Sequence, residues 1–425
     1  MIAFHYPPAQ GYSGIQRGLK FSSQLPEFGW EPLVLSAHPR AYAQVGPQQM
    51  EAIPPGLTVR RAFALDALRH LSIGGRYPRL AALPDRWASW WLGGVPAGLA
   101  LIRRFRPRAL WSTQPIPTAH LIGRTLARLT GLPWVADFRD AMLTDTCPAD
   151  PLLRRLHLRL EQRFVTAASR VVVTTPGLRS LMGGRHPQLP AERWAVIPNG
   201  YDEDDFRDLP GHAPRPLAAG EPVVLLHSGR FYPRAEERDP RPFLQALSTL
   251  RQQGTIAPET LQVVLRAPGM EDILAPAIQA GGLERIVQIK PLLPYREALR
   301  EMTSVHGLLL FQGAEFGHHI PAKLFEYLRS GRPILALTEP DGDTARLLRE
   351  AHLDGIVPMC DPGAIAAALG RFIAAIRAGE ARGADPERVA CHSRRQRAAA
   401  LAGLLDGLHQ VENTRGGATS GIVTS

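Results

Sequence analysis

Cysteine is scarce in this 425-residue sequence. The three cysteines, Cys147, Cys360 and Cys391, lie far apart and show neither a CxxC spacing nor a metal-ligand pattern. This excludes a disulfide-stapled fold and a cysteine zinc site, and it favours reduced, structural thiols.

Long apolar runs are absent too. None reaches the roughly 18 residues that a bilayer-spanning helix needs. The best candidate, residues 87–102, is interrupted by Gly93, Gly94 and Pro96. The first residues show no basic segment followed by an apolar one, so we expect no secretory signal. The sequence therefore predicts a cytoplasmic protein.

Lysine is also rare in this sequence. Of the 49 basic residues only Lys20, Lys290 and Lys323 are lysines, and the net charge is +10. The arginines are spread along the chain without a dense basic run or interleaved aromatic residues, which argues against a nucleic-acid partner. The charge favours another anionic partner, either a nucleotide diphosphate or a membrane surface that carries a lipid acceptor.

Short apolar, β-branched runs alternate with amphipathic stretches, which is typical of βαβ units and parallel sheets. In the first half we expect strands at residues 2–5, 32–36, 109–112, 134–137, 170–174 and 194–197. The pattern then restarts, with strands expected at residues 223–227, 262–266, 286–289, 307–311 and 333–337. The fold class is therefore α/β, with two Rossmann-like, doubly wound parallel sheets in tandem.

A turn signal at residues 198–200 and the Pro- and Gly-rich residues 208–221 place a domain boundary near residues 199–205. We expect residues 1–205 to form the first domain and residues 206–384 the second. Residues 385–412 would form a last helix that packs back on the first domain. The Gly-, Ser- and Thr-rich residues 413–425 are expected to be a disordered tail.

The first strand is followed by a turn that contains Gly11 and Gly14. Glycines at this place let backbone N–H groups approach a phosphate, and the dipole of the following helix adds to the attraction. The spacing is not G-x-G-x-x-G, so this is not a dinucleotide-binding fingerprint. A plain tight turn remains the alternative.

The second half repeats this arrangement with Gly229 and Arg230 directly after a strand, and Arg238 a little further on. Two fixed cations beyond the end of a strand can neutralise a pyrophosphate as it leaves, without a metal ion. Alternatively, Arg238 is an ordinary surface arginine.

Residues 317–336 are the most informative stretch. Pro321 suits the first turn of a helix and Gly331 suits its end. Glu326, further along this helix, could accept hydrogen bonds from both hydroxyls of a ribose, or it could pair with a nearby arginine. The free N–H groups at the helix start would face a phosphate. The residues expected there are Ile320, Pro321, Ala322 and Lys323.

Three further side chains, His120, Asp140 and His318, are candidates for a catalytic role. His120 and Asp140 lie near the carboxyl ends of expected strands, where open α/β sheets place ligands. A packed His120 and a salt-bridged Asp140 are the alternatives. His318 and His319 are adjacent, but no Cys or carboxylate stands at a zinc-like spacing, so we expect no metal site.

Trp87, Trp90 and Trp91 lie close together and are flanked by arginines. Tryptophan beside arginine suits a shallow contact with the inner face of a membrane. The helical spacing of the three rings suits core packing equally well, so both interpretations stay open.

Taken in order, these residues resemble glycosyltransferase family 4 and its relatives of the GT-B fold. The similarity runs from Tyr6 to about residue 370 and is most specific in residues 321–336. The resemblance implies transfer of a sugar from a nucleotide diphosphate, bound in the cleft between the two halves, to a hydroxyl acceptor. It also implies retention, a donor-binding second domain, an acceptor-side first domain, and no need for a metal or a cofactor.

The resemblance also suggests roles for single residues. Gly11 and Gly14 would sit near the donor phosphates and the acceptor, with Arg17 in the following helix. Arg230 and Arg238 match the family's basic pair on the diphosphate.

Glu326 matches the second glutamate of the family's Glu-x7-Glu signature, which holds the donor ribose. The first glutamate, near the transferred sugar, falls at position 318, where this sequence has His318. We therefore take His318, together with His120 and Asp140, as the candidate catalytic side chains.

Two other functions stay open. A nucleotide-sugar 2-epimerase of the same fold would need carboxylates near the sugar carbon. A catalytically silent GT-B scaffold in polysaccharide assembly would agree with His318 at the position of a glutamate. The sequence does not specify the base, the sugar or the acceptor, for which a lipid-linked sugar, a growing polysaccharide and a small metabolite are the candidates.

Overall fold

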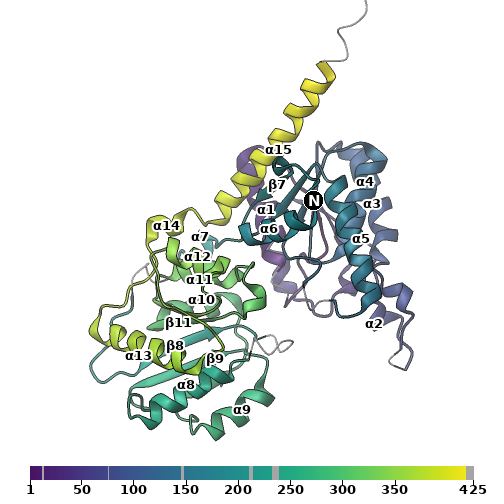
Figure 1. Ribbon diagram of the computed structural model, residues 1–425. Coiled ribbons are helices and arrows are strands. Elements are labelled where there is room, and N and C mark those ends of the chain that lie inside the picture. Colours follow the sequence, from purple (N-terminus) through teal and green to yellow (C-terminus); the bar gives the residue numbers. More distant parts are fainter. Residues whose placement is uncertain (12–13, 75, 145–147, 210–213, 232–238, 418–425) are drawn as a thin grey trace, which may run out of the picture. The chain divides into compact units, whose positions relative to one another are not determined.

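The computed structural model describes every residue except 12–13, 75, 145–147, 210–213, 232–238 and 418–425. The chain divides into two compact units, each built around its own sheet (Figure 1). The first unit comprises Met1–Pro198 and Arg394–Ser425, and the second comprises Asn199–Ser393.

The first unit contains a parallel sheet in the order β3-β2-β1-β4-β5-β6-β7. Its strands are β1 (Ile2–Ala3), β2 (Leu33–Ala37), β3 (Thr58–Ala62), β4 (Leu110–Thr113), β5 (Trp134–Phe138), β6 (Arg170–Val173) and β7 (Trp194–Val196). Its helices are α1 (Ile15–Gln24), α2 (Ala67–His70), α3 (Trp90–Phe105), α4 (Pro117–Thr130), α5 (Pro151–Ala167), α6 (Pro176–Arg185) and α15 (Arg394–Gly417).

The second unit has a parallel sheet in the order β10-β9-β8-β11-β12-β13. Its strands are β8 (Val223–Ser228), β9 (Leu261–Arg266), β10 (Val287–Lys290), β11 (Gly307–Phe311), β12 (Ile334–Leu337) and β13 (Ile356–Val357). Its helices are α7 (Glu203–Phe206), α8 (Arg241–Gln252), α9 (Glu271–Ala280), α10 (Tyr295–Ser304), α11 (Ala322–Ser330), α12 (Asp343–Glu350), α13 (Pro362–Ala378) and α14 (Pro386–Ala390).

Local sequence sets many of the helix ends. α5 and α6 both have proline in the first turn, where no N–H donor is needed. The Asp150 carboxylate and the Thr175 hydroxyl accept backbone hydrogen bonds at the two helix starts. Gly131 ends α4, and Gly331 ends α11, in the left-handed conformation that glycine tolerates.

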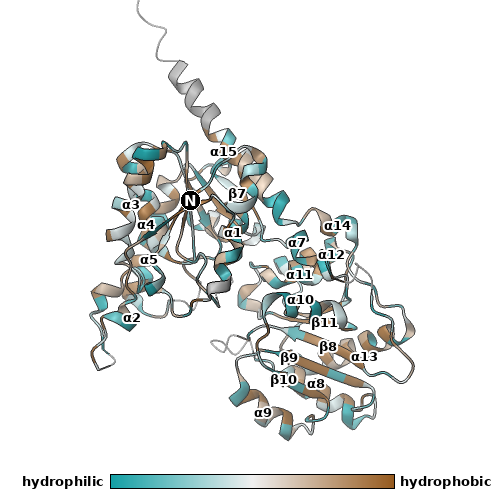
Figure 2. Cartoon of the chain, turned by 180° about the vertical axis from the view of Figure 1, so that it is seen from behind, coloured by the Kyte–Doolittle hydropathy of each residue, from teal (hydrophilic) through white to brown (hydrophobic). Residues whose placement is uncertain are grey.

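The predicted fold class is confirmed, since both sheets are parallel and doubly wound. Strand β3 was not predicted, because Thr58, Arg60 and Arg61 interrupt its apolar pattern. The buried β strands of the second unit follow the hydrophobic runs closely and appear brown in Figure 2.

The predicted termini and boundary need correction. The units divide between Pro198 and Asn199, at the start of the expected boundary region, so residues 199–205 belong to the second unit. The last long helix begins at Arg394, after the short α14, and continues to Gly417. Residues 413–417 are therefore helical rather than a disordered tail, and residues 418–425 lie outside the described part.

Helix α15 packs on the first unit, where its apolar side chains meet the core on the α1 side of the sheet. Ala398, Leu401 and Leu405 are buried there beside Phe21 and Trp111. No helix within the described residues is both long and apolar enough to cross a bilayer.

Candidate functional site

In each sheet the strand order reverses at one point, and ligands of open α/β sheets bind at the carboxyl ends of the strands around such a point. In the second sheet the reversal lies between β8 and β11. Gly229 follows β8, and the segment from Gln312 to α11 follows β11. The predicted donor residues of the second unit therefore sit where the fold favours ligand binding.

Gly229 and Lys323 meet at this place. Gly229 has φ of +110°, and a Cβ atom placed on it would lie 2.8 Å from Nζ of Lys323. Glycine is therefore needed here both for its conformation and for the approach of the ammonium group. Burial lowers the pKa of Lys323 to about 8, while the carboxylate of Glu326 acts to raise it.

Helix α11 begins at the same place. Pro321 is its N-cap, and the half-buried Ala322 and Lys323 form its first turn. The first N–H groups of a helix have no partner within it, so they can bind an anion. Ile320 precedes this turn and packs against the core of the second unit.

Glu326 is buried one turn further along, with 9% of its surface exposed. Its Oε1 accepts a hydrogen bond of 2.8 Å from the Tyr295 hydroxyl, which also donates to Asp205 at 3.4 Å. The Tyr327 hydroxyl accepts from the backbone N–H of Ser228 at 2.9 Å, which ties α11 to the end of β8.

The loop before α11 is held in place by Gln312. The side-chain amide of Gln312 donates to the backbone oxygens of Phe316 and His319, at 2.9 and 3.0 Å. The Thr338 hydroxyl donates to the side-chain oxygen of Gln312 at 3.0 Å, and the Thr344 hydroxyl donates to the backbone oxygen of His319 at 3.0 Å. The approach to the helix start is thereby fixed before any ligand arrives.

Arg230 is exposed directly after Gly229, and its side chain lies against Gly269 in the neighbouring β9–α9 turn. A Cβ atom on Gly269 would be 3.4 Å from Cγ of Arg230. Arg238, the other predicted member of the basic pair, lies outside the described residues.

In the first unit the reversal lies between β1 and β4, and Gly11 and Gly14 stand in the turn after β1. Gly11 has φ of +81°, which glycine adopts readily. The guanidinium of Arg139 packs so closely on Gly14 that a Cβ atom would overlap it. Burial lowers the pKa of Arg139, while the neighbouring Asp140 acts to raise it.

Arg17 of α1 is buried rather than open to a ligand. It forms a bidentate pair with Asp137, at 2.9 and 2.7 Å, and only 3% of Arg17 and none of Asp137 is exposed. Arg17 also donates to the backbone oxygens of Ile197 and Pro198, at 2.9 and 3.0 Å. Arg17 therefore fixes α1, and the glycine turn before it, against the carboxyl edge of the sheet.

Of the three candidate catalytic side chains, His120 is placed in the core. It is fully buried, its Nδ1 lies 2.7 Å from the Ser112 hydroxyl, and burial lowers its pKa to about 3. The packing interpretation thus replaces the acceptor-side one. Asp140 is exposed beside Arg139, and His318 is half-buried with its ring 4.3 Å from that of His319.

The tryptophans also belong to the core. Trp90 is fully buried, Trp87 is 9% exposed, and the indole N–H of the half-buried Trp91 donates to Thr125 at 3.0 Å. The structure therefore supports the core-packing interpretation of these rings.

Within the described residues, no group of three His, Cys, Asp or Glu side chains is arranged to hold a metal ion. Cys360 and Cys391 are exposed free thiols, and Cys147 lies outside the described part.

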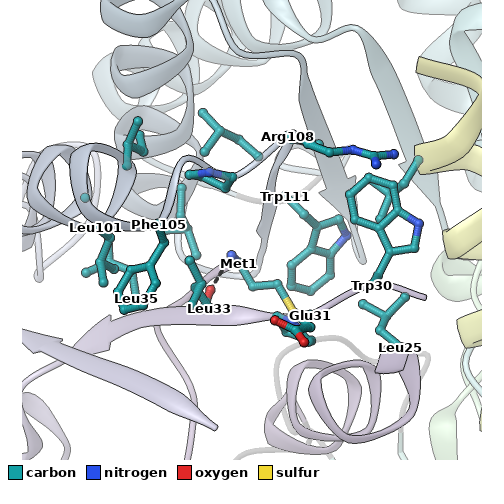
Figure 3. A pocket seen from close by; sticks show the side chains of 18 of the residues that line it. Met1, Leu25, Trp30, Glu31, Leu33, Leu35, Leu101, Phe105, Arg108 and Trp111 are labelled. Atoms are coloured by element: carbon teal, nitrogen blue, oxygen red, sulfur yellow. Dashed lines mark hydrogen bonds between the residues drawn. The ribbon is translucent and has the colours of Figure 1, made fainter. Parts of the chain in front are cut away.

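A cavity of about 400 Å³ lies at the opposite, amino edge of the first sheet (Figure 3). Its walls are mainly apolar, with Trp30 and Trp111 facing it, and the backbone nitrogen of Met1 donates to Leu33 there at 2.7 Å. Because open α/β sheets bind ligands at their carboxyl edge, this cavity is not the candidate site.

Residues 15–200 match the sequence profile of the glycosyl transferase 4-like domain. Together with the solved structures described next, this match shows that the chain has the GT-B fold. A search of curated sequences found no match to this chain.

Solved structures of glycosyltransferases show the same fold along the full length of this chain. Sucrose-phosphate synthase from Thermosynechococcus elongatus is 17% identical with a TM-score of 0.66, and the match covers 96% of this chain and 99% of that one. Trehalose 6-phosphate synthase from Burkholderia multivorans is 12% identical with a TM-score of 0.67, covering 100% and 98%. Anabaena HepE, solved with UDP, is 16% identical with a TM-score of 0.57, covering 98% and 99%.

Two side chains of the candidate sites were not singled out from the sequence. Tyr295 contacts Glu326 from a different helix, and its position at the start of α10 carries no signal of that contact. Arg139 was given no role from the sequence, although its approach to Gly14 places a cation beside the first glycine turn.

Proposed function

We propose that the protein is a glycosyltransferase that binds a nucleotide diphosphate sugar in its second unit, at the start of α11, and transfers the sugar to a hydroxyl acceptor. The observation that carries this proposal is the meeting of Gly229, Lys323 and the first turn of α11, one turn before the buried Glu326. A close-approach glycine, a cation and free N–H groups form a site for a diphosphate.

The nucleoside would extend toward Glu326. A carboxylate can accept hydrogen bonds from both ribose hydroxyls, and the Tyr295 hydroxyl bond orients it for this role. The HepE structures contain UDP and UDP-glucose. We therefore place UDP first among the bases to be tested.

In the reaction, the acceptor oxygen forms a bond to the anomeric carbon as the bond from that carbon to the diphosphate oxygen breaks. The diphosphate leaves with the electron pair, and its departing oxygen takes the acceptor's proton. Lys323, Arg230 and the α11 N–H groups stabilise the charge that develops there. We propose that transfer proceeds with retention and without a metal ion, as in the family that the sequence resembles.

The test is a thermal-shift screen of UDP-, GDP- and ADP-sugars, followed by mass spectrometry of the products formed with glycan and lipid-linked acceptors. We expect one donor class to stabilise the protein and one acceptor to gain a sugar. A donor that binds tightly but is never transferred would favour the scaffold, and an epimerised free donor would favour the epimerase.

Arg238 remains a predicted contact of the diphosphate. We expect Arg238→Ala to lower turnover far more than Arg382→Ala, a change of an exposed arginine in the same unit. Equal turnover by the two variants would remove Arg238 from the proposed site.

A further inference from the structure

The first unit carries a projection between β3 and α3, formed by the described residues 67–74 and 76–83 and called here the α2 projection. Its two ends meet at its base. The backbone N–H of Ala67 donates to the Arg86 oxygen at 2.8 Å, and the Arg86 guanidinium lies 3.4 Å from the Asp66 carboxylate. Figure 1 shows α2 and the adjoining loop extending away from the sheet of this unit.

The α2 projection exposes large apolar side chains. Ile73 is 87% exposed and Leu80 is 82% exposed. Figure 2 shows hydrophobic and hydrophilic residues intermixed around α2. Several large apolar side chains exposed within one short segment are typical of an interaction surface. The other exposed apolar residues of the projection are Leu68, Leu71, Tyr77 and Leu83.

The charge of the α2 projection is of one sign. It contains Arg69, Arg76 and Arg79 and no acidic residue. The two flanking carboxylates point inward: Asp66 is fully buried, and Asp85 accepts two hydrogen bonds from Thr118, at 2.8 and 2.7 Å.

The surrounding sequence has the same bias. Residues 52–136 contain twelve arginines and two aspartates, a net charge of +10 that equals the charge of the entire chain. Three of these arginines lie in the projection and three more, Arg60, Arg61 and Arg86, flank it, whereas the other six lie in α3, in α4 and between α3 and β4. At the base of the projection, one of these arginines, Arg79, pairs with Asp150.

Apolar and basic groups are presented together at the end of the projection. Ile73 and Arg76 face each other across an isolated antiparallel bridge, with the Ile73 N–H donating to the Arg76 oxygen at 2.8 Å. A nucleic acid would not require the exposed Ile73 and Leu80, and a purely apolar partner would not require the arginines. A bilayer with anionic headgroups satisfies both, because apolar side chains enter the acyl boundary while arginines bind the phosphates.

We propose that the α2 projection docks the first unit on an anionic membrane surface. The projection follows the carboxyl end of β3, at the edge of the sheet that also bears the glycine turn. The Arg61 side chain of β3 donates to the Pro7 oxygen of that turn. Docking would bring this edge to acceptors carried by lipids, a consequence that rests on the proposed sugar transfer, whereas membrane binding itself does not.

The experiment is co-sedimentation of the full chain with vesicles of phosphatidylcholine, with and without phosphatidylglycerol. One test variant is Ile73→Ser with Leu80→Ser, and the other is Arg76→Gln with Arg79→Gln. The wild-type protein is expected to bind only the anionic vesicles. The arginine variant should lose about fivefold in partition for each arginine removed, and high salt should weaken wild-type binding.

Matched control variants alter equally exposed residues of the second unit. They are Leu292→Ser, at a side chain that is 75% exposed, and Arg371→Gln with Arg388→Gln. The controls should bind as the wild type does, and all variants should keep the wild-type unfolding temperature because every changed side chain is exposed. Failure of the wild type to bind anionic vesicles at low salt, or undiminished binding by either test variant, would overturn the proposal. Neither result would affect donor binding or transfer to a water-soluble acceptor.

Discussion

At the scale of single residues, Lys323 links the candidate donor site to pH. Its pKa is lowered to about 8, so it is mainly charged at neutral pH and loses its proton within an accessible range. A diphosphate binds the charged form. We therefore expect the Kd for a nucleoside diphosphate to rise above pH 8, by at most about tenfold per pH unit.

The control for this prediction is Lys323→Arg, because arginine keeps its charge across the whole range. Calorimetric titration between pH 7.5 and 9.5 should show a sloping profile for the wild type and a flat one for the variant. If the Kd of the wild type and the Kd of the variant depended on pH in the same way, Lys323 would not face the diphosphate.

A second residue-scale prediction concerns Arg17 and Asp137. Arg17→Met would leave the fully buried Asp137 carboxylate without its cation, which should cost about 3–5 kcal/mol of unfolding free energy. The double variant Arg17→Met with Asp137→Leu should recover much of that loss, because no charge stays buried. Urea denaturation followed by circular dichroism measures the unfolding free energy of both variants. An Arg17→Met variant as stable as the wild type would contradict the assignment of Arg17 and Asp137 as a buried ion pair.

At the scale of elements, the glycines of α3 explain a misleading sequence signal. Gly93 and Gly94 interrupt an apolar run, and no helix was predicted there. In the structure they let α3 pack closely: a Cβ atom on Gly93 would lie 2.5 Å from the Phe63 backbone oxygen, and one on Gly94 would lie 2.6 Å from Ile122. Such contacts cannot be read from the sequence, because each partner is far along the chain.

This packing predicts that Gly93→Ala destabilises the first unit by about 1–3 kcal/mol, since the backbone of Phe63 cannot move aside as a flexible side chain could. The matched control is Gly183→Ala in α6, where an added Cβ atom meets nothing within 4 Å. The control should be neutral or more stable by up to about 1 kcal/mol, because alanine favours the helix. Equal thermal unfolding of the two variants would refute the packing argument.

Much of the element pattern was predictable because buried parallel strands are short apolar runs, as in β8 and β11. Strand β3 was missed because three of its five side chains are polar or charged. Within the candidate site, the start of α11 could be predicted from Pro321 and Gly331. The contacts of Lys323 with Gly229 and of Tyr295 with Glu326 could not, since they join different elements.

At the scale of the whole molecule, the chain contains two similar parallel sheets whose carboxyl edges carry different side chains. The first unit holds its glycine turn with the buried Arg17–Asp137 pair, and the second presents Lys323, the α11 start and Glu326. The net charge of +10 resides within residues 52–136 of the first unit. We propose that the second unit binds the donor and that the first contacts the surface that carries the acceptor.

The most direct test of the account compares UDP with 2′-deoxy-UDP by calorimetric titration, using GDP or ADP and their deoxy forms if the donor screen selects them. The wild type should bind the ribonucleotide at least about tenfold more tightly, or about 1.4 kcal/mol. Glu326→Gln should weaken ribonucleotide binding and lose most of the discrimination, whereas Glu350→Gln, a change of an exposed glutamate on α12, should leave both unchanged. Full discrimination in the Glu326→Gln variant would contradict the account.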